Sequence, residues 1–110
     1  MKKIYLFCDQ GMSTSMLAKR MQDIGEKHNL PLEVKAHSIK TLEKIMEEQN
    51  PDCILLGPQV SHLFDDTKKR LENYNVPVGV IDSADYGMMD GERVLKKAIL
   101  LMKNHKKRGE

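Results

Sequence analysis

Four short apolar segments alternate along the chain with four amphipathic segments, and this alternation limits the possible folds. The apolar segments are 4–7, 32–36, 53–56 and 76–81. Three of them are almost continuously apolar, as strands buried on both faces should be. Segment 32–36 instead alternates apolar and polar residues, which is typical of an edge strand. Strands separated by helices predict a parallel sheet with right-handed crossovers.

Each amphipathic segment has a stripe of residues at the 3.6-residue spacing of a helix. The stripe positions are Leu17, Met21, Ile24 and His28; Leu42, Ile45 and Met46; Val60, Leu63, Phe64, Thr67, Leu71 and Tyr74; and Val94, Leu95, Ala98, Ile99 and Met102. We expect Asp90 to cap the last helix. The predicted architecture is α/β: a four-stranded parallel sheet of order 2-1-3-4 with helices on both faces, in a single doubly wound domain over residues 1–110.

Composition argues against several classes of function. The 18 Lys and Arg residues nearly balance the 16 Asp and Glu residues, so the chain lacks the basic excess typical of nucleic-acid-binding domains. No apolar run approaches a membrane span, and the apolar N-terminal run is too short for a secretory signal. We therefore expect a cytoplasmic protein without membrane insertion. Cys8 and Cys53 should be free thiols, with Cys53 in the core, and no residues at metal-ligand spacing predict a metal site.

Unusual polar segments follow three of the four predicted strands. These segments are 8–15, 57–59 and 82–87. The carboxyl ends of parallel strands meet at one edge of the sheet, and ligands bind there beside the point where the strand order reverses. We expect the three segments to converge on one crevice, with 8–15 and 57–59 flanking the reversal point.

Segment 8–15 places a cysteine just before a predicted helix N-terminus. Backbone N–H groups at a helix start are unpaired and bind anions, most naturally phosphate. Gly11 permits a tight turn, and the hydroxyl side chains can cap the helix or donate to phosphate oxygens. We predict that Cys8 is a nucleophile at the rim of this phosphate-binding loop, whose field stabilises a thiolate that accepts a phosphoryl group. The predicted loop residues are Asp9, Gln10, Gly11, Met12, Ser13, Thr14 and Ser15.

Other interpretations of this segment stay open. Low-molecular-weight cysteine phosphatases have an arginine six residues after the nucleophile, where this chain has Thr14. Without that guanidinium the loop should hydrolyse phosphate esters poorly, which suits a carrier better than a phosphatase. The same loop would also suit an anion-binding regulatory module with an inert Cys8. Finally, Cys8 would be an ordinary core thiol if the hydroxyl residues only cap the helix.

The motifs at the three strand ends resemble those of one known family. Residues 7–15 (FCDQGMSTS), 55–59 (LLGPQ), 80–83 (VIDS) and 86–91 (YGMMDG) look like the enzyme IIB component of the lactose/cellobiose (chitobiose) family of the phosphoenolpyruvate-dependent sugar phosphotransferase system. The resemblance covers almost the whole chain. It implies a four-stranded parallel sheet flanked by helices, with no metal or organic cofactor.

The resemblance also implies a function and partners. Cys8 would take a phosphoryl group from a phosphohistidine on a IIA protein. It would pass the group to a sugar bound by a membrane IIC permease, typically a β-linked disaccharide such as cellobiose, chitobiose or lactose. The protein would therefore be a phosphotransferase component that works between two protein partners.

The two residues after Cys8 depart from the family pattern, which usually has small uncharged residues there. A carboxylate at Asp9 should repel a thiolate and a phosphoryl dianion, so we expect Asp9 to point outward to solvent. Beyond the first loop, Gln59, Asp82 and Tyr86 are candidates for supporting the site or contacting a partner. Gln59 would donate to phosphate or satisfy loop backbone. We expect Asp82 to cap the following turn rather than to contact a loop donor. Tyr86 would pack over the site or join an interface.

Overall fold

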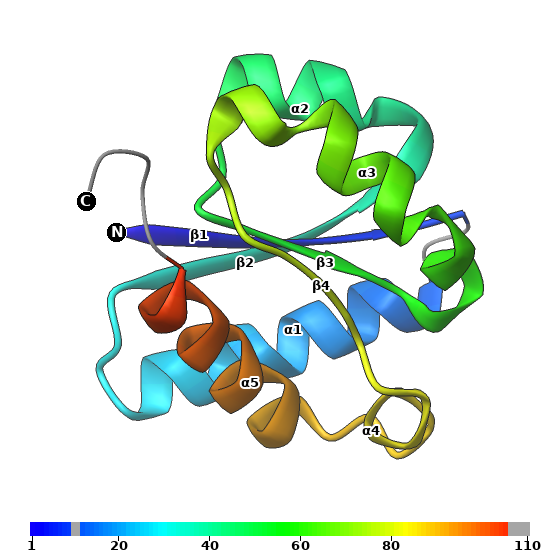
Figure 1. Cartoon of the computed structure of the whole chain (residues 1–110). Coiled ribbons are helices and arrows are strands. Elements are labelled where there is room, and N and C mark those ends of the chain that lie inside the picture. Colours follow the sequence, from blue (N-terminus) through cyan, green and yellow to red (C-terminus); the bar gives the residue numbers. More distant parts are fainter. Residues whose placement is uncertain (10–11, 106–110) are drawn as a thin grey trace.

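Four parallel strands form the centre of the computed structural model, which describes residues 1–9 and 12–105, with Met12 described by its backbone alone. The strands lie in the order β2-β1-β3-β4, as predicted (Figure 1). They are β1 (Lys2–Cys8), β2 (Leu32–Ser38), β3 (Cys53–Leu56) and β4 (Val78–Val80). Cys8 pairs with Ser38 of β2, and Phe7 pairs with Leu56 of β3. The register therefore places the ends of β1 and β3 beside each other.

Helices cover both faces of the sheet, which confirms the predicted layers (Figure 1). On one face lie α2 (Leu42–Gln49) and α3 (Phe64–Arg70), and on the other lie α1 (Met12–Lys27), α4 (Ser83–Gly87) and α5 (Gly91–Asn104). Short 3₁₀ turns cover Ile39–Thr41, Pro58–Leu63 and Glu72–Tyr74. Among the residues described, no helix combines the length and the apolarity needed to cross a bilayer.

Two elements differ from the sequence prediction. The third helical stripe begins as a 3₁₀ turn, because Pro58 lies at the start of that turn and Val60 has a non-helical φ of −118°. Segment 82–87, in which only a turn after Asp82 was predicted, contains α4. The Asp82 side chain caps this helix, accepting hydrogen bonds from the amides of Ala84 at 2.9 Å and Asp85 at 3.2 Å. The predicted cap at Asp90 is confirmed by its 3.0 Å hydrogen bond from the Arg93 amide.

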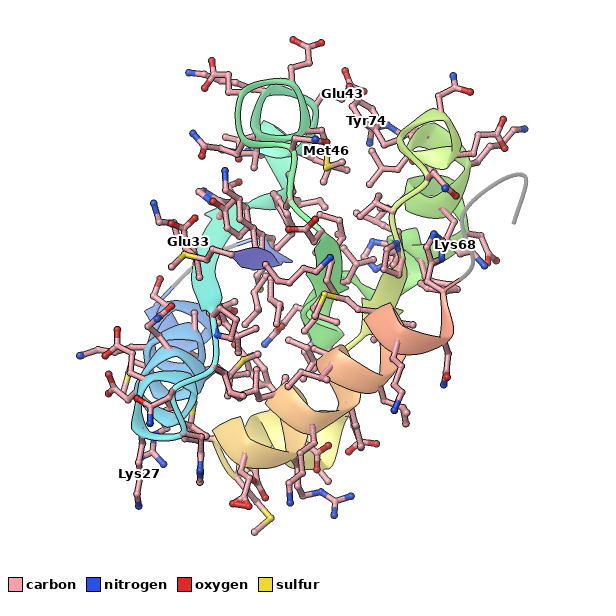
Figure 2. All side chains as sticks on the ribbon, turned by 90° about the vertical axis from the view of Figure 1, so that its left-hand side faces the viewer. Lys27, Glu33, Glu43, Met46, Lys68 and Tyr74 are labelled. Carbon is pink, nitrogen blue, oxygen red and sulfur yellow. The ribbon has the colours of Figure 1, made fainter. Side chains whose placement is uncertain are left out.

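The core consists of two apolar layers, one on each face of the sheet. Successive side chains of β1 point to opposite faces, so Ile4 and Leu6 pack toward α1 and α5 whereas Tyr5 and Phe7 pack toward α2. Figure 2 shows Met46 of α2 directed toward the sheet. Cys53 lies in the core, as predicted, and its burial, reinforced by the charge of Asp52, raises the pKa of its thiol to about 12.

Polar contacts from two side chains, Tyr5 and Gln22, hold the edge strand β2. The buried Tyr5 hydroxyl donates to Glu33 Oε2 at 2.5 Å, and this hydrogen bond lowers the pKa of Glu33. The pKa of Tyr5 is raised mainly by burial and further by the contact with Glu33. From α1, the Gln22 amide accepts a hydrogen bond from the Val34 amide at 2.7 Å and donates to the Leu32 carbonyl at 3.2 Å. These contacts fix β2 at the edge of the sheet.

Candidate functional site

The carboxyl ends of β1 and β3 bring Cys8 and segment 57–59 together. The Gly57 amide donates to the Phe7 carbonyl at 2.8 Å, which extends the β1–β3 pairing by one residue. Gln59 follows two residues later, in the 3₁₀ turn. The structure therefore confirms that the segments after the first and third strands meet at one point. That point is the reversal of strand order, where open parallel sheets bind their ligands.

The Cys8 sulfur contacts two polar side chains. The thiol lies 3.3 Å from Gln59 Oε1 and 3.4 Å from Asp9 Oδ1, and each oxygen is placed to accept its S–H hydrogen bond. Asp9 and Gln59 are exposed, whereas Cys8 is only 1% exposed. The sulfur is thus covered, and not open at the rim of the loop as expected. Asp9 is exposed to solvent, as predicted, but its carboxylate does not point away from the thiol, because Oδ1 contacts the sulfur.

Gly57 leaves room for this sulfur. A Cβ atom at position 57 would lie 3.3 Å from Cys8 Sγ and 3.0 Å from Gln59 Oε1, both closer than ordinary contact. The backbone φ of −63° is open to any residue, so the requirement for glycine here is spatial. The Gly-Pro-Gln sequence marks this position as a turn, but only the pairing of β1 with β3 shows that it faces the thiol.

The first turn of α1 supplies the other half of the predicted phosphate loop. The helix begins at Met12, four residues after Cys8, and its first amides have no partner within the helix. Ser13 and Ser15 are exposed. Thr14 is fully buried, and its hydroxyl shares a 3.1 Å hydrogen bond with the Tyr86 hydroxyl. The Thr14 side chain therefore connects α1 to α4.

Part of the predicted loop lies outside the described residues. Gln10 and Gly11 are among these, as is the side chain of Met12. Their assignment to phosphate binding stays a prediction. Asp82 caps α4, so its expected structural role is confirmed, and Tyr86 reaches the start of α1 through Thr14. The segment after the fourth strand therefore contacts the first turn of α1.

The sequence prediction missed an ion-pair cluster that holds α4. The Asp85 carboxylate is buried and accepts hydrogen bonds from Lys97 Nζ at 2.6 Å and Arg93 Nε at 2.9 Å. The Lys97 contact, together with that of Arg93, holds the pKa of Asp85 below its usual range. Since α4 carries Tyr86, this cluster also positions the partner of Thr14. Asp85 and its partners lie on different helices, so no helical spacing in the sequence indicates the contact.

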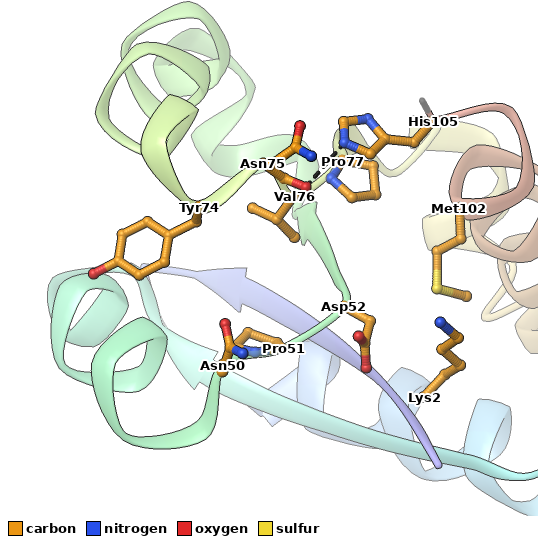
Figure 3. A pocket seen from close by; sticks show the side chains of 10 residues that line it. All are labelled: Lys2, Asn50, Pro51, Asp52, Tyr74, Asn75, Val76, Pro77, Met102 and His105. Carbon is orange, nitrogen blue, oxygen red and sulfur yellow. Dashed lines mark hydrogen bonds between the residues drawn. The ribbon is translucent and has the colours of Figure 1, made fainter. Parts of the chain in front are cut away.

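A polar cavity lies at the opposite end of the strands (Figure 3). It has a volume of about 240 Å³ and is lined by Lys2, Asp52 and His105 among others. The His105 ring lies 3.0 Å from the Asn75 carbonyl oxygen, to which its Nε2–H can donate. Lys2 and Cys8 are at opposite ends of β1, about 20 Å apart at the usual strand rise. The cavity is therefore separate from the cysteine site.

The arrangement around Cys8 suits nucleophilic chemistry on an anionic group. A thiol lies beside a carboxylate and a neutral amide, near a helix N-terminus whose amides favour negative charge. His62 is exposed on the 3₁₀ turn after β3. In the part of the chain that the structure describes, no three His, Cys, Asp or Glu side chains are grouped closely enough to hold a metal ion.

Comparison with known proteins gives consistent matches over nearly the whole chain. Residues 3–97 match the family described as the lactose/cellobiose-specific IIB subunit of the phosphotransferase system (PTS). The oligo-beta-mannoside-specific EIIB component of Bacillus subtilis is 38% identical over 104 residues, covering 94% of this chain and 99% of the relative. The galactose-specific EIIB component of Lactococcus lactis subsp. cremoris is also 38% identical over 104 residues, covering 92% of this chain and 96% of the relative.

Two solved structures share this architecture. The lactose-specific IIB domain from Streptococcus pneumoniae aligns with a TM-score of 0.82 at 16% identity, covering 91% of this chain and 96% of that one. This match supports the fold alone. The cellobiose-specific IIB protein from Borrelia burgdorferi aligns with a TM-score of 0.73 at 27% identity, covering 96% of each chain.

Proposed function

Because the chain belongs to the lactose/cellobiose-specific IIB family of the phosphotransferase system, we propose that it is a phosphocarrier with Cys8 as the carrying residue. It takes a phosphoryl group from a phosphohistidine on a IIA protein and passes it to a sugar bound by a membrane IIC permease. The observation that carries this proposal is the position of Cys8 at the carboxyl end of β1, beside the end of β3 and four residues before α1. That residues 1–110 act as one such unit stays a prediction.

The surroundings of the sulfur support a role in holding phosphate. The amides at the start of α1, which have no partner within the helix, offer donors and the positive end of the helix dipole. Ser13 and Ser15 add exposed hydroxyl groups. The Gln59 amide oxygen lies 3.3 Å from the Cys8 sulfur in the resting protein, and a half-turn about its last torsion presents its NH₂ group to phosphoryl oxygens. Phosphoryl transfer needs little more than such positioning and charge stabilisation.

The covered sulfur must become accessible before transfer. Asp9 and Gln59 contact it, and both are exposed. Rotation of the Gln59 side chain moves its polar end away from the sulfur without any change in the sheet, while Asp9 keeps its contact. Docking of the IIA protein over this edge supplies the reason for rotation, because the donor phosphoryl group attracts the Gln59 NH₂ group.

We propose that the sugar is a β-linked disaccharide such as cellobiose, chitobiose or lactose, recognised on the IIC partner. The similar proteins carry names with different specificities, including oligo-beta-mannoside, galactose and cellobiose. Proteins that are each 38% identical to this chain are therefore named for different sugars. The choice of sugar is tested by supplying these β-linked sugars with membranes that contain the matching permease.

One observation favours a second candidate function. Cys8 is only 1% exposed, as an inert thiol in an anion-binding regulatory module would be. A cysteine phosphatase has less support, because Thr14 occupies the position of the phosphatase arginine and its side chain is buried against Tyr86. The regulatory alternative and the carrier differ in whether a covalent bond to sulfur forms.

Labelled phosphoenolpyruvate, the general phosphotransferase proteins and a lactose/cellobiose-type IIA protein test the proposal. If the protein is a carrier, the wild type retains an acid-stable, thiol-reagent-sensitive label, and Cys8→Ala loses it. Cys53→Ala, the matched control for Cys8→Ala, retains the label. An active cascade that leaves the wild type unlabelled supports the regulatory module. Turnover of an aryl phosphate at ordinary enzyme rates supports the phosphatase.

A further inference from the structure

The carboxylate of Asp9 is in contact with the sulfur that the proposed function uses. Its Oδ1 atom lies 3.4 Å from Cys8 Sγ, and the thiol donates to it. The other hydrogen-bond acceptor is Gln59 Oε1 at 3.3 Å, and Gly57 borders the sulfur on the same side. Of these three neighbours, Asp9 is the one with an acidic side chain that can hold a proton. A carboxylate in contact with a nucleophilic thiol has the geometry of a general base.

The same contact raises an electrostatic problem. Transfer of a phosphoryl group to Cys8 removes the thiol proton and leaves a phosphoryl dianion on the sulfur. If Asp9 stayed ionised, its negative charge would lie directly beside that dianion. Like charges at contact distance disfavour each other, and the low exposure of Cys8 weakens the screening by water. A proton moved from the sulfur to Asp9 removes one of the two charges.

We propose, resting on the phosphocarrier function above, that Asp9 is a catalytic residue that takes the Cys8 proton during transfer. The Asp9 carboxylate accepts the S–H proton as the sulfur lone pair attacks phosphorus. The S–P bond forms and the P–N bond of the phosphohistidine breaks. The electron pair of the P–N bond returns to the imidazole nitrogen, whose ring holds a proton on its other nitrogen, so a neutral imidazole leaves. The proton stays on the Asp9 carboxyl group.

The protonated Asp9 then has a second use. As a neutral carboxylic acid it donates its O–H to a phosphoryl oxygen, so a repulsive contact becomes a hydrogen bond. When the S–P bond later breaks, the same proton returns to the leaving sulfur. Asp9 thus acts as a base during phosphorylation and as an acid during release of the group. The amide of Gln59 accepts a hydrogen bond but does not hold the proton, so it cannot replace Asp9 in this step.

The test uses the full chain and a IIA protein of the lactose/cellobiose class, phosphorylated by phosphoenolpyruvate and the general proteins. Single-turnover transfer to Cys8 is measured by rapid quenching with saturating phosphorylated IIA protein. Asp9→Asn keeps the shape and the hydrogen-bond acceptor but cannot hold the proton. An unassisted thiol is only a few per cent ionised near neutral pH, so the variant should react about tenfold to thirtyfold more slowly at about pH 6.5.

The pH dependence distinguishes a base from a structural residue. At about pH 9.5 most free thiols ionise without help, so the rates of Asp9→Asn and the wild type should converge to within about threefold. Asp23→Asn is the matched control: it removes the same charge from an exposed site on α1 paired with Lys19 and should transfer at the wild-type rate. Asp9→Glu, which restores a carboxylate, should recover part of the loss at low pH.

Three results would overturn the proposal for Asp9. If the transfer rate of Asp9→Asn equals or exceeds that of the wild type at both pH values, Asp9 is only a solvated or repulsive charge. An equal loss at both pH values would make it a structural residue. A wild type that forms no phosphocysteine at all would refute the carrier function together with the role of Asp9. In the first two cases Cys8 still becomes labelled, so the carrier function stands without the base.

Discussion

A methyl group added at Gly57 should impair phosphoryl transfer more than it destabilises the fold. In Gly57→Ala the new Cβ atom would lie 3.3 Å from Cys8 Sγ and 3.0 Å from Gln59 Oε1. Gln59 ends in a flexible, exposed side chain that can move away, but the sulfur sits on a buried strand. The sulfur must therefore shift by a few tenths of an ångström, and the methyl group occupies space beside it.

The size of both effects follows from this geometry. Overpacking of a tight site costs about 1–3 kcal/mol, and the low end, about 1 kcal/mol, applies because the closest atom is free to move. A misplacement of about 1 Å at a reacting centre costs roughly a hundredfold in rate. A shift of a few tenths of an ångström therefore predicts a loss of roughly fourfold to tenfold in transfer to Cys8.

Gly87→Ala is the matched control, because a Cβ atom at position 87 would meet nothing within 4 Å. Urea unfolding measures stability, and rapid-quench transfer from phosphorylated IIA protein measures the rate. The control should differ from the wild type by less than about 0.5 kcal/mol and twofold. A transfer rate in Gly57→Ala equal to that of the wild type would refute the argument that Gly57 borders the reacting sulfur. So would an equal rate loss in Gly87→Ala.

Two further predictions concern contacts that hold the sheet and α4. Tyr5→Phe should lower the free energy of unfolding by about 1 kcal/mol at neutral pH, because it removes a hydrogen bond to a charged but partly hydrated Glu33. Because that bond lowers the pKa of Glu33, the stability difference between Tyr5→Phe and the wild type should shrink as the pH falls below the ordinary glutamate value of 4.5. Urea titrations at several pH values that show a constant difference would contradict this prediction. Asp85→Asn should lower the melting temperature at neutral pH. The effect should largely disappear in acid, because contacts with Lys97 and Arg93 keep the pKa of Asp85 low. An unchanged melting temperature at neutral pH would show that the cluster does not stabilise α4.

The strand order and the place of the site could be predicted because they depend on regular patterns. Continuous apolar runs, one alternating edge run and intervening helical stripes leave few topologies for right-handed crossovers. The ends of β1 and β3 then meet by geometry, whatever the loops contain. The burial of Cys53 could be predicted from the same pattern, since this residue begins a strand that is buried throughout. The cap at Asp90 is a local signal that needs no tertiary contact.

The details of the site depend on contacts between distant residues. Cys8 is covered partly by Gln59, which is 51 residues away in the chain, and Thr14 pairs with Tyr86 at a separation of 72 residues. No periodic pattern encodes such pairs. The direction of Asp9 depends on the backbone just after β1, where neither strand nor helix periodicity applies. The expectation that its charge would turn only to solvent ignored the thiol as a hydrogen-bond donor.

The central claim is that the sulfur of Cys8 carries a phosphoryl group covalently. Intact-mass spectrometry after the complete cascade, followed by fragmentation that preserves the S–P bond, tests it directly. The wild type and Cys53→Ala should each gain one phosphoryl group located on Cys8, and Cys8→Ala should gain none. A phosphoryl group located on any other residue, or an unmodified wild type beside a fully phosphorylated IIA protein, would contradict the claim.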